Sequence, residues 1–195
     1  MTLARLVVLV SGNGSNLQAV LDGCAAGDLD AHVVAVISDR PDALGLERAR
    51  RSNVPAIALP KVVAQDRAAY DAVLATRIAT FEPDWIVLAG WMRLLSVSLL
   101  DRFAGKVVNL HPALPETFPG THAIERAFTA YQRGEIAHTG VMVHLVPDEG
   151  VDSGPVLAQQ VVSIEPDDTL ETLAARMHAT EHDLLVNTLH LLCAT

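Results

Sequence analysis

The chain has 195 residues, half of them hydrophobic and 19% charged, and its formal net charge is −9. This composition excludes an intrinsically disordered chain, and the acidic balance argues against nucleic-acid binding, which requires a basic patch. Two cysteines are too few for a disulfide framework, and no apolar stretch is long enough to span a membrane, so we expect a soluble cytoplasmic protein of one domain over residues 1–195.

Short β-branched runs alternate with longer helical stretches through the first half of the chain. The expected strands are 6–10, 33–38, 56–59, 85–89 and 107–110, with helices at 16–26, 43–52, 66–81 and 97–103. Continuous apolar runs separated by helices are typical of a mostly parallel sheet covered on both faces.

The rhythm changes in the second half. After a helix at 123–133, strands at 140–146 and 155–163 follow each other closely, as in a hairpin-like pair, and a helix over 169–192 closes the pattern. We predict an α/β fold with an open, mostly parallel, doubly wound sheet, a late antiparallel strand pair and a C-terminal helix. Ligands of such sheets bind beyond the carboxyl ends of the strands.

Asn109 and His111 lie two residues apart where the fifth expected strand ends. Side chains at positions i and i+2 of an extended segment point to the same side, so a carboxamide and an imidazole converge on one spot. That pair suits stabilisation of an oxyanion at a carbonyl carbon. Turn formation before Pro112 is the alternative explanation of the same residues.

A glycine-rich loop, residues 11–16, joins the first strand to the first helix. Glycines permit close backbone approach, and the helix N-terminus offers unpaired N–H groups to an anion. Leu17 replaces the third glycine of a dinucleotide fingerprint and no P-loop lysine follows, so a small phosphomonoester fits best. The alternative is a tight turn in which Ser15 or Asn16 caps the helix.

The acidic loop 147–155 carries Asp152 between Val151 and a Ser-Gly-Pro turn. A carboxylate beside an imidazole raises the imidazole pKa, keeps it charged, and helps to carry a proton from an attacking amine. A solvated turn is the alternative for this loop. His122 and His144 stay open, with a structural role favoured for both.

The segment from His178 to His182 matches the H-x-x-E-H zinc pattern. A zinc site of this pattern needs a third ligand from further along the chain. The only candidates there are Asp183, which lies on another helical face, and His190, so a zinc site is disfavoured. We therefore expect no metal, and we expect Glu181 to reach into a site from its helix.

Together these segments resemble the phosphoribosylglycinamide formyltransferase family over nearly the whole chain. The resemblance rests on segments 10–19, 44–49, 90–95, 109–112, 118–120 and 143–155, in that order. It implies a Rossmann-like fold and transfer of the formyl group of 10-formyltetrahydrofolate to glycinamide ribonucleotide in de novo purine biosynthesis, without a metal. It implies small-molecule partners, with no nucleic acid or membrane, and a monomer or homodimer.

The resemblance also implies roles for individual residues. The catalytic residues would be Asn109, His111 and Asp152. The residues holding the ribonucleotide would be Gly14, Ser15, Asn16 and Glu181. The residues contacting the folate would be Arg67, Met92, Arg93, Leu94, Leu95, Asp148, Glu149, Gly150 and Val151. One departure is the stretch 113–116, Ala-Leu-Pro-Glu, where the family usually has Ser-Leu-Leu-Pro.

Three other functions compete with this interpretation. The first is another folate-dependent N-formyltransferase. For one that acts on methionyl-tRNA we expect a basic second domain, and for one that acts on a sugar nucleotide we expect no phosphate loop. The second is formyltetrahydrofolate hydrolase, for which we expect a preceding regulatory domain. The third is a non-catalytic phosphoribosyl-binding module, whose binding would not depend on His111.

Overall fold

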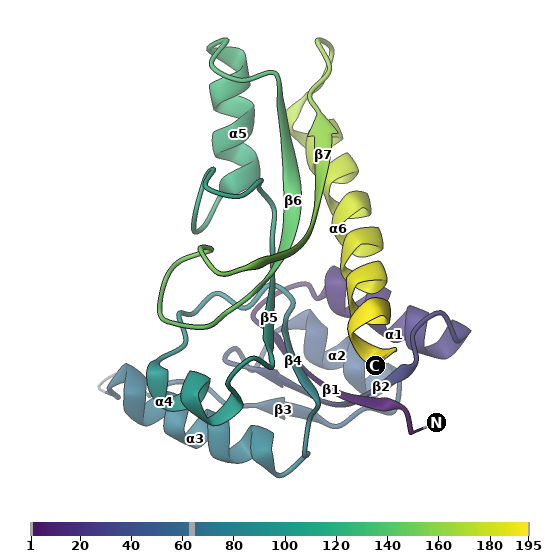
Figure 1. Cartoon of the computed structure of the whole chain (residues 1–195), viewed down its shortest axis with the longest axis vertical. Coiled ribbons are helices and arrows are strands. Elements are labelled where there is room, and N and C mark those ends of the chain that lie inside the picture. Colours follow the sequence, from purple (N-terminus) through teal and green to yellow (C-terminus); the bar gives the residue numbers. More distant parts are fainter. Residues whose placement is uncertain (1, 63–64, 195) are drawn as a thin grey trace.

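The computed structural model describes residues 2–62 and 65–194, which build a seven-stranded sheet of order β3-β2-β1-β4-β5-β6-β7 (Figure 1). The parallel strands are β1 (Ala4–Val10), β2 (Ala31–Ser38), β3 (Ala56–Ala58), β4 (Trp85–Leu88) and β5 (Val107–His111). The strands β6 (His138–Leu145) and β7 (Val156–Ser163) are added antiparallel to β5. The predicted α/β class and late antiparallel pair are confirmed.

The helices follow the predicted order with shifted ends. They are α1 (Ser15–Ala26), α2 (Leu44–Arg51), α3 (Arg67–Ala79), α4 (Val97–Leu100), the 3-10 turn η1 (Asp101–Phe103), α5 (Ala123–Gln132) and α6 (Leu170–Cys193). Two N-termini are held by side-chain caps: Asp66 accepts from the Ala69 amide, and Thr169 forms a reciprocal capping box with Thr172. These caps explain why α3 and α6 begin one residue later than the periodic pattern predicts.

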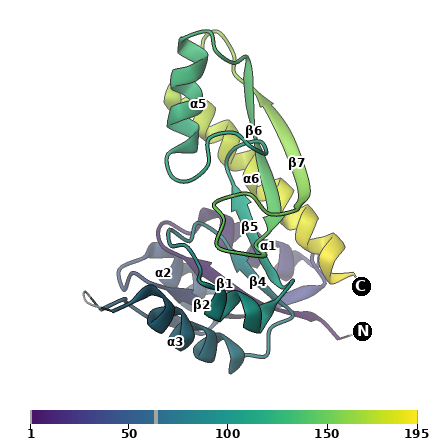
Figure 2. The same ribbon diagram turned by 60° about the vertical axis from the view of Figure 1, so that its left-hand side comes forward.

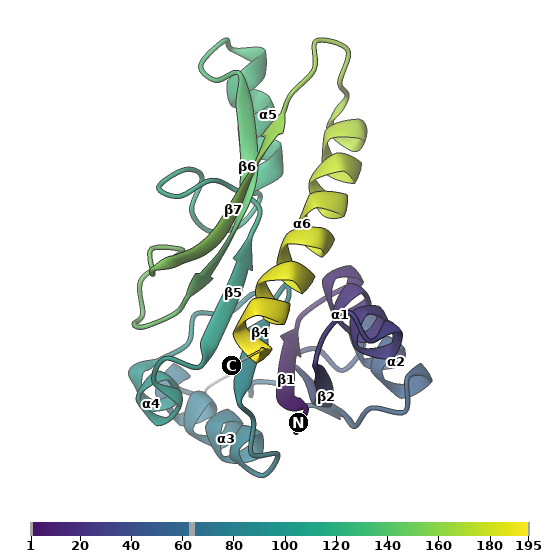
Figure 3. The same cartoon turned by 45° about the vertical axis from the view of Figure 1, so that its right-hand side comes forward.

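Two apolar clusters sandwich the parallel part of the sheet. Side chains of α1, α2 and α6 pack on one face and those of α3 and α4 on the other. Figure 3 shows these two groups of helices on opposite sides of the sheet. The cover predicted for both faces therefore holds for the parallel strands, whereas β7 is a largely exposed edge strand. The pair β6–β7 and α5 extend away from the parallel part (Figure 2). No described helix is both long and apolar enough to cross a membrane.

The strand order has its switch point between β1 and β4, because β2 and β3 are added on one side of β1 and β4 and β5 on the other. The loops that follow β1 and β4 meet at this point. The Ser11 amide donates to the Gly90 carbonyl at 3.0 Å, and the Ser11 hydroxyl accepts from the Met92 amide at 3.0 Å. Next along the sheet, Asn109 of β5 is in register with Leu88 of β4 and His144 of β6. Three predicted site segments are thus gathered at the carboxyl ends of adjacent strands, where open α/β sheets bind ligands.

Candidate active site

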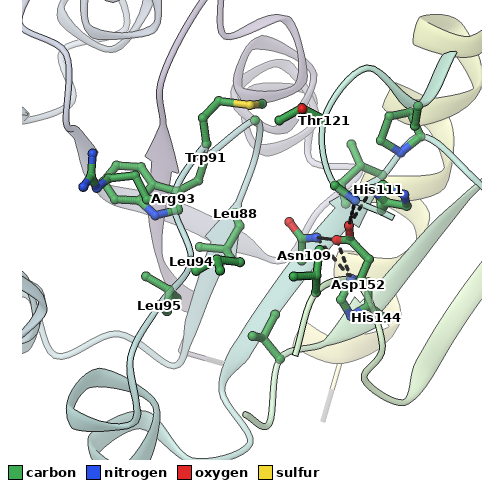
Figure 4. A pocket seen from close by; sticks show the side chains of 18 of the residues that line it. Leu88, Trp91, Arg93, Leu94, Leu95, Asn109, His111, Thr121, His144 and Asp152 are labelled. Atoms are coloured by element: carbon green, nitrogen blue, oxygen red, sulfur yellow. Dashed lines mark hydrogen bonds and ion pairs between the residues drawn. The ribbon is translucent and has the colours of Figure 1, made fainter. Parts of the chain in front are cut away.

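Asn109 and His111 are both held by β5, which continues one residue beyond its predicted end. His111 is in register with Met142 of β6, and its side chain is 5% exposed. Because the two residues alternate with buried Leu110, their side chains leave the same face of the strand (Figure 4). The convergence predicted from their spacing is confirmed.

Asp152 joins this pair from the loop between β6 and β7. Asn109 Nδ2 donates to Asp152 Oδ1 at 3.0 Å, and His111 Nδ1 lies 3.2 Å from Asp152 Oδ2. The Gly120 amide also donates to Oδ2, at 2.8 Å. Asp152 has a φ of 51°, a left-handed conformation that a non-glycine residue keeps only when its surroundings hold it. The carboxylate is therefore fixed between the amide and the imidazole.

Both ring nitrogens of His111 face oxygen acceptors. Nδ1 faces the Asp152 carboxylate, and Nε2 lies 3.1 Å from the Phe118 carbonyl oxygen. An imidazolium satisfies both contacts, whereas a neutral ring would turn a lone pair toward one of them. Burial lowers the pKa of His111 below its usual value, because the Asp152 carboxylate and the Phe118 carbonyl, which act in the opposite direction, offset only part of the effect of burial; the predicted net rise of the His111 pKa is therefore wrong. The ring is therefore placed to carry a proton that it also releases readily.

Asp152 keeps its negative charge in this setting. Burial acts to raise its pKa, but the neighbouring histidines and the Gly120 amide outweigh burial and hold the pKa below its usual range. A charged carboxylate at neutral pH is what the interpretation of Asp152 as the partner of His111 requires.

His144 also belongs to this cluster, a place that was not predicted from the sequence. Its Nδ1 donates to the Leu145 carbonyl at 2.8 Å, so a neutral ring leaves Nε2 free to accept from Asn109 Nδ2 at 3.1 Å. Both amide hydrogens of Asn109 are then engaged, by His144 and by Asp152. Donation from Asn109 to an oxyanion requires release of one of these bonds. The signal for His144 was its position as a histidine in an otherwise apolar strand.

A cavity of about 790 Å³ opens beside the cluster. Its apolar wall, drawn in part in Figure 4, includes Leu88, Trp91, Met92, Leu94, Leu95, Ile124, Val146 and Val151. The indole Nε1 of Trp91 is buried and has no hydrogen-bond partner among the described residues. The volume, and the apolar wall beside a cluster of polar side chains, suit a small organic molecule.

Most of the residues predicted to contact the folate line this cavity. They are Met92, Arg93, Leu94, Leu95, Asp148, Glu149, Gly150 and Val151. Arg67 is not among the lining residues, but it forms an ion pair with Glu149, whose other carboxylate oxygen accepts from the Val97 amide at 3.0 Å. The Arg93 guanidinium carbon lies over the Tyr70 ring, 5.2 Å from its centroid. Arg93 Nη1 forms an ion pair with Asp39 Oδ2 at 3.5 Å.

The residues predicted to hold the ribonucleotide form a separate group, and none of them lines the cavity. Asn16 Nδ2 donates to Glu181 Oε2 at 2.8 Å, and Asn16 Oδ1 is buried without a partner in the described structure. The alternative in which Ser15 or Asn16 caps α1 is wrong, because Gly14 is the N-cap, with φ 75° and no side-chain hydrogen bond. The first amides of α1 are thus left without a side-chain cap.

Comparison with known proteins agrees with this geometry. Residues 4–189 match the formyl transferase family. The phosphoribosylglycinamide formyltransferase of Schizosaccharomyces pombe is 44% identical over 96% of this chain and 96% of its own, and that of Mycobacterium tuberculosis H37Rv is 45% identical over 94% and 82%. The crystal structure of glycinamide ribonucleotide transformylase 1 from Symbiobacterium toebii superposes with a TM-score of 0.92 and 40% identity, covering 99% of this chain and 89% of that one. The chain belongs to the formyl transferase family.

Proposed function

We propose that this protein transfers the formyl group of 10-formyltetrahydrofolate to the amine of glycinamide ribonucleotide, a step of purine biosynthesis. The observation that carries the proposal is the hydrogen-bonded cluster of Asn109, His111 and Asp152 at the wall of an apolar cavity. The names and high identity of the relatives support the choice of the ribonucleotide as acceptor.

The reaction proceeds by addition and elimination. The amine nitrogen attacks the formyl carbon, a C–N bond forms, and the carbonyl oxygen gains negative charge. Protonated His111 donates to that oxygen once its Nε2 is released from the Phe118 carbonyl, and Asn109 contributes a second hydrogen bond once it is released from one of its own partners. The C–N10 bond then breaks, and the proton lost by the amine passes to the folate nitrogen. Asp152 stabilises the imidazolium and assists this proton transfer.

The two substrates occupy different surfaces. The folate ring lies in the apolar cavity, of which the loop from Asp148 to Val151 forms one rim. The phosphate of the ribonucleotide is held by Gly14, Ser15 and Asn16, because the amides at the start of α1 lack a side-chain cap and attract an anion. Glu181 supports this loop through Asn16. The proposed partners are these small molecules, in the cytoplasm, for a monomer or homodimer of a single domain.

An assay of formyl transfer from 10-formyltetrahydrofolate to glycinamide ribonucleotide, followed by absorbance, tests the proposal. We expect turnover that is lost in His111→Ala. A hydrolase would release formate at the same rate without the ribonucleotide. A binding module would hold the ribonucleotide equally well with and without the His111 side chain and show no turnover. Either of these results, with folded protein, contradicts the proposal.

A further inference from the structure

One short turn, residues 118–120, contacts both members of the His111–Asp152 pair. The Phe118 carbonyl oxygen lies 3.1 Å from His111 Nε2, and the Gly120 amide donates to Asp152 Oδ2 at 2.8 Å. The turn therefore holds the imidazole at one end and the carboxylate at the other. A displacement of the turn would move both groups with respect to the cavity.

The turn is held in an unfavourable backbone conformation. Phe118, in the turn, has φ 46°, and His122, just beyond it, has φ 59°; both lie in the left-handed region that L-residues with side chains rarely adopt. Such conformations cost free energy and persist only where surrounding contacts impose them. The turn therefore needs an external restraint to keep its carbonyl groups in place.

Arg126 of α5 provides that restraint. Its Nη2 donates to the Phe118 carbonyl at 2.6 Å and to the Pro119 carbonyl at 2.6 Å, and its guanidinium carbon lies 5.9 Å from the centroid of the Phe118 ring. One nitrogen thus bridges two consecutive carbonyl oxygens, while the side chain packs along the ring of the same turn. The Arg126 amide in turn donates to the His122 carbonyl, at the end of the loop.

Arg126 does not itself line the cavity, although its neighbour Glu125 does. Its contacts lead to the turn and, through the Phe118 carbonyl that it shares with His111, to the reacting groups. We propose that Arg126 is a positioning residue for formyl transfer, which fastens the 118–120 turn to α5 and thereby orients His111 against Asp152. This proposal rests on the proposed function for the roles of those two residues.

The experiment compares Arg126→Ala and Arg126→Gln with Arg133→Ala, a control at the C-terminal end of the same helix whose side chain is 68% exposed. We expect kcat to fall on the order of 10-fold to 100-fold in both Arg126 variants, because a misplacement of about 1 Å can cost 10²-fold, and both KM values to stay near wild type. Arg126→Lys should recover part of the loss, since an ammonium lacks the planar fork but still donates.

A second readout separates positioning from a general loss of stability. The ¹⁵N signal of His111 Nε2 and the pH dependence of kcat should shift in the Arg126 variants and stay unchanged in Arg133→Ala. If Arg126→Ala does not fold, Arg126→Gln decides. A wild-type kcat in a folded Arg126 variant overturns the proposal, and so does a change confined to KM, which would mean direct substrate binding.

The outcome for Arg126 is distinguishable from failure of the proposed function. If the wild-type protein shows no formyl transfer, the function fails, while the His111 signal still reports whether Arg126 orients the ring. If the wild type is active, and neither the ¹⁵N signal of His111 Nε2 nor kcat changes in the Arg126 variants, only the positioning role fails.

Discussion

Asn16 and Glu181 are joined by a hydrogen bond of 2.8 Å from Nδ2 to Oε2, although 165 positions separate them in the chain. The bond connects Asn16, the last residue of the predicted phosphate loop and part of the first turn of α1, to the middle of α6. Glu181 is 4% exposed, so its carboxylate is a structural partner of the loop and not a surface charge. The conformation of the predicted phosphate loop thus depends on a residue near the opposite end of the sequence.

This bond predicts two effects of Glu181→Ala. Loss of the carboxylate leaves Asn16 Nδ2 unpaired beside an Oδ1 that already lacks a partner, and an unsatisfied buried group costs about 1–3 kcal/mol of unfolding free energy. The loosened loop should also raise KM for the ribonucleotide more than KM for the folate. Urea denaturation and steady-state kinetics measure the two effects. Asp183→Asn, at an exposed position of the same helix, is the control, and equal results for both variants would refute the prediction.

Asp152→Asn should lower both turnover and the pKa of His111. The carboxylate stabilises the imidazolium and so raises the His111 pKa against the effect of burial; a neutral amide removes this support, and the pKa falls further below its usual value. We expect kcat to drop on the order of 10²–10³, the scale for losing one oxyanion donor, because His111 with a lower pKa is less often protonated and then lacks the proton that it donates to the oxyanion. An NMR titration of His111 measures the pKa. An unchanged or higher His111 pKa in Asp152→Asn would show that the pair is not coupled as the distances indicate.

The sequence predicted those features of the site that depend on local periodicity. Alternation along β5 placed Asn109 and His111 on one side, and the change of rhythm after α5 predicted the antiparallel pair. The contact between His144 and Asn109 was not predictable, because it requires the register between β5 and β6. The role of the Phe118 carbonyl was also hidden, since any residue can supply a carbonyl and only the loop conformation aims it.

The start of α1 shows why a local rule failed. Ser15 and Asn16 are both good N-cap residues, so the sequence alone favours either as the cap. In the structure Gly14 takes that position, because its left-handed backbone lets the loop approach Gly45 of α2 closely. Contact with a second helix, and not propensity within the first, decides where α1 begins.

That contact predicts a difference between two glycines of the same loop. A Cβ on Gly14 would lie 2.7 Å from Gly45 Cα, a backbone atom, and the new residue would have to keep a φ of 75°. A Cβ on Gly12 would meet nothing within 4 Å. Gly14→Ala should therefore lower the unfolding free energy by more than about 1 kcal/mol, and Gly12→Ala by clearly less. Chemical denaturation of the two variants makes the comparison. Equal stability losses would mean that the close approach of α1 and α2 is relaxed at little cost.

Asp168 predicts a pH dependence of stability at the start of α6. Arg176 Nη2 donates to its Oδ1 at 2.6 Å and Nη1 to its Oδ2 at 2.9 Å, and the Glu165 amide donates to Oδ2 at 2.7 Å. These bonds hold the pKa of Asp168 far below its usual range, and the bonds from Arg176 have the largest effect.

Because the pKa of Asp168 is lower in the folded state, the carboxylate contributes stability above its unfolded pKa of about 3.9, and this contribution is lost as pH falls through the folded pKa. Asp168→Asn should therefore be less stable than wild type at pH 7, and the difference should narrow below about pH 4. Urea denaturation of both proteins between pH 7 and pH 3 measures it. Asp167→Asn, the neighbouring exposed carboxylate, controls for net charge. A difference between Asp168→Asn and wild type that is constant over this range would show that the ion pair does not couple folding to protonation.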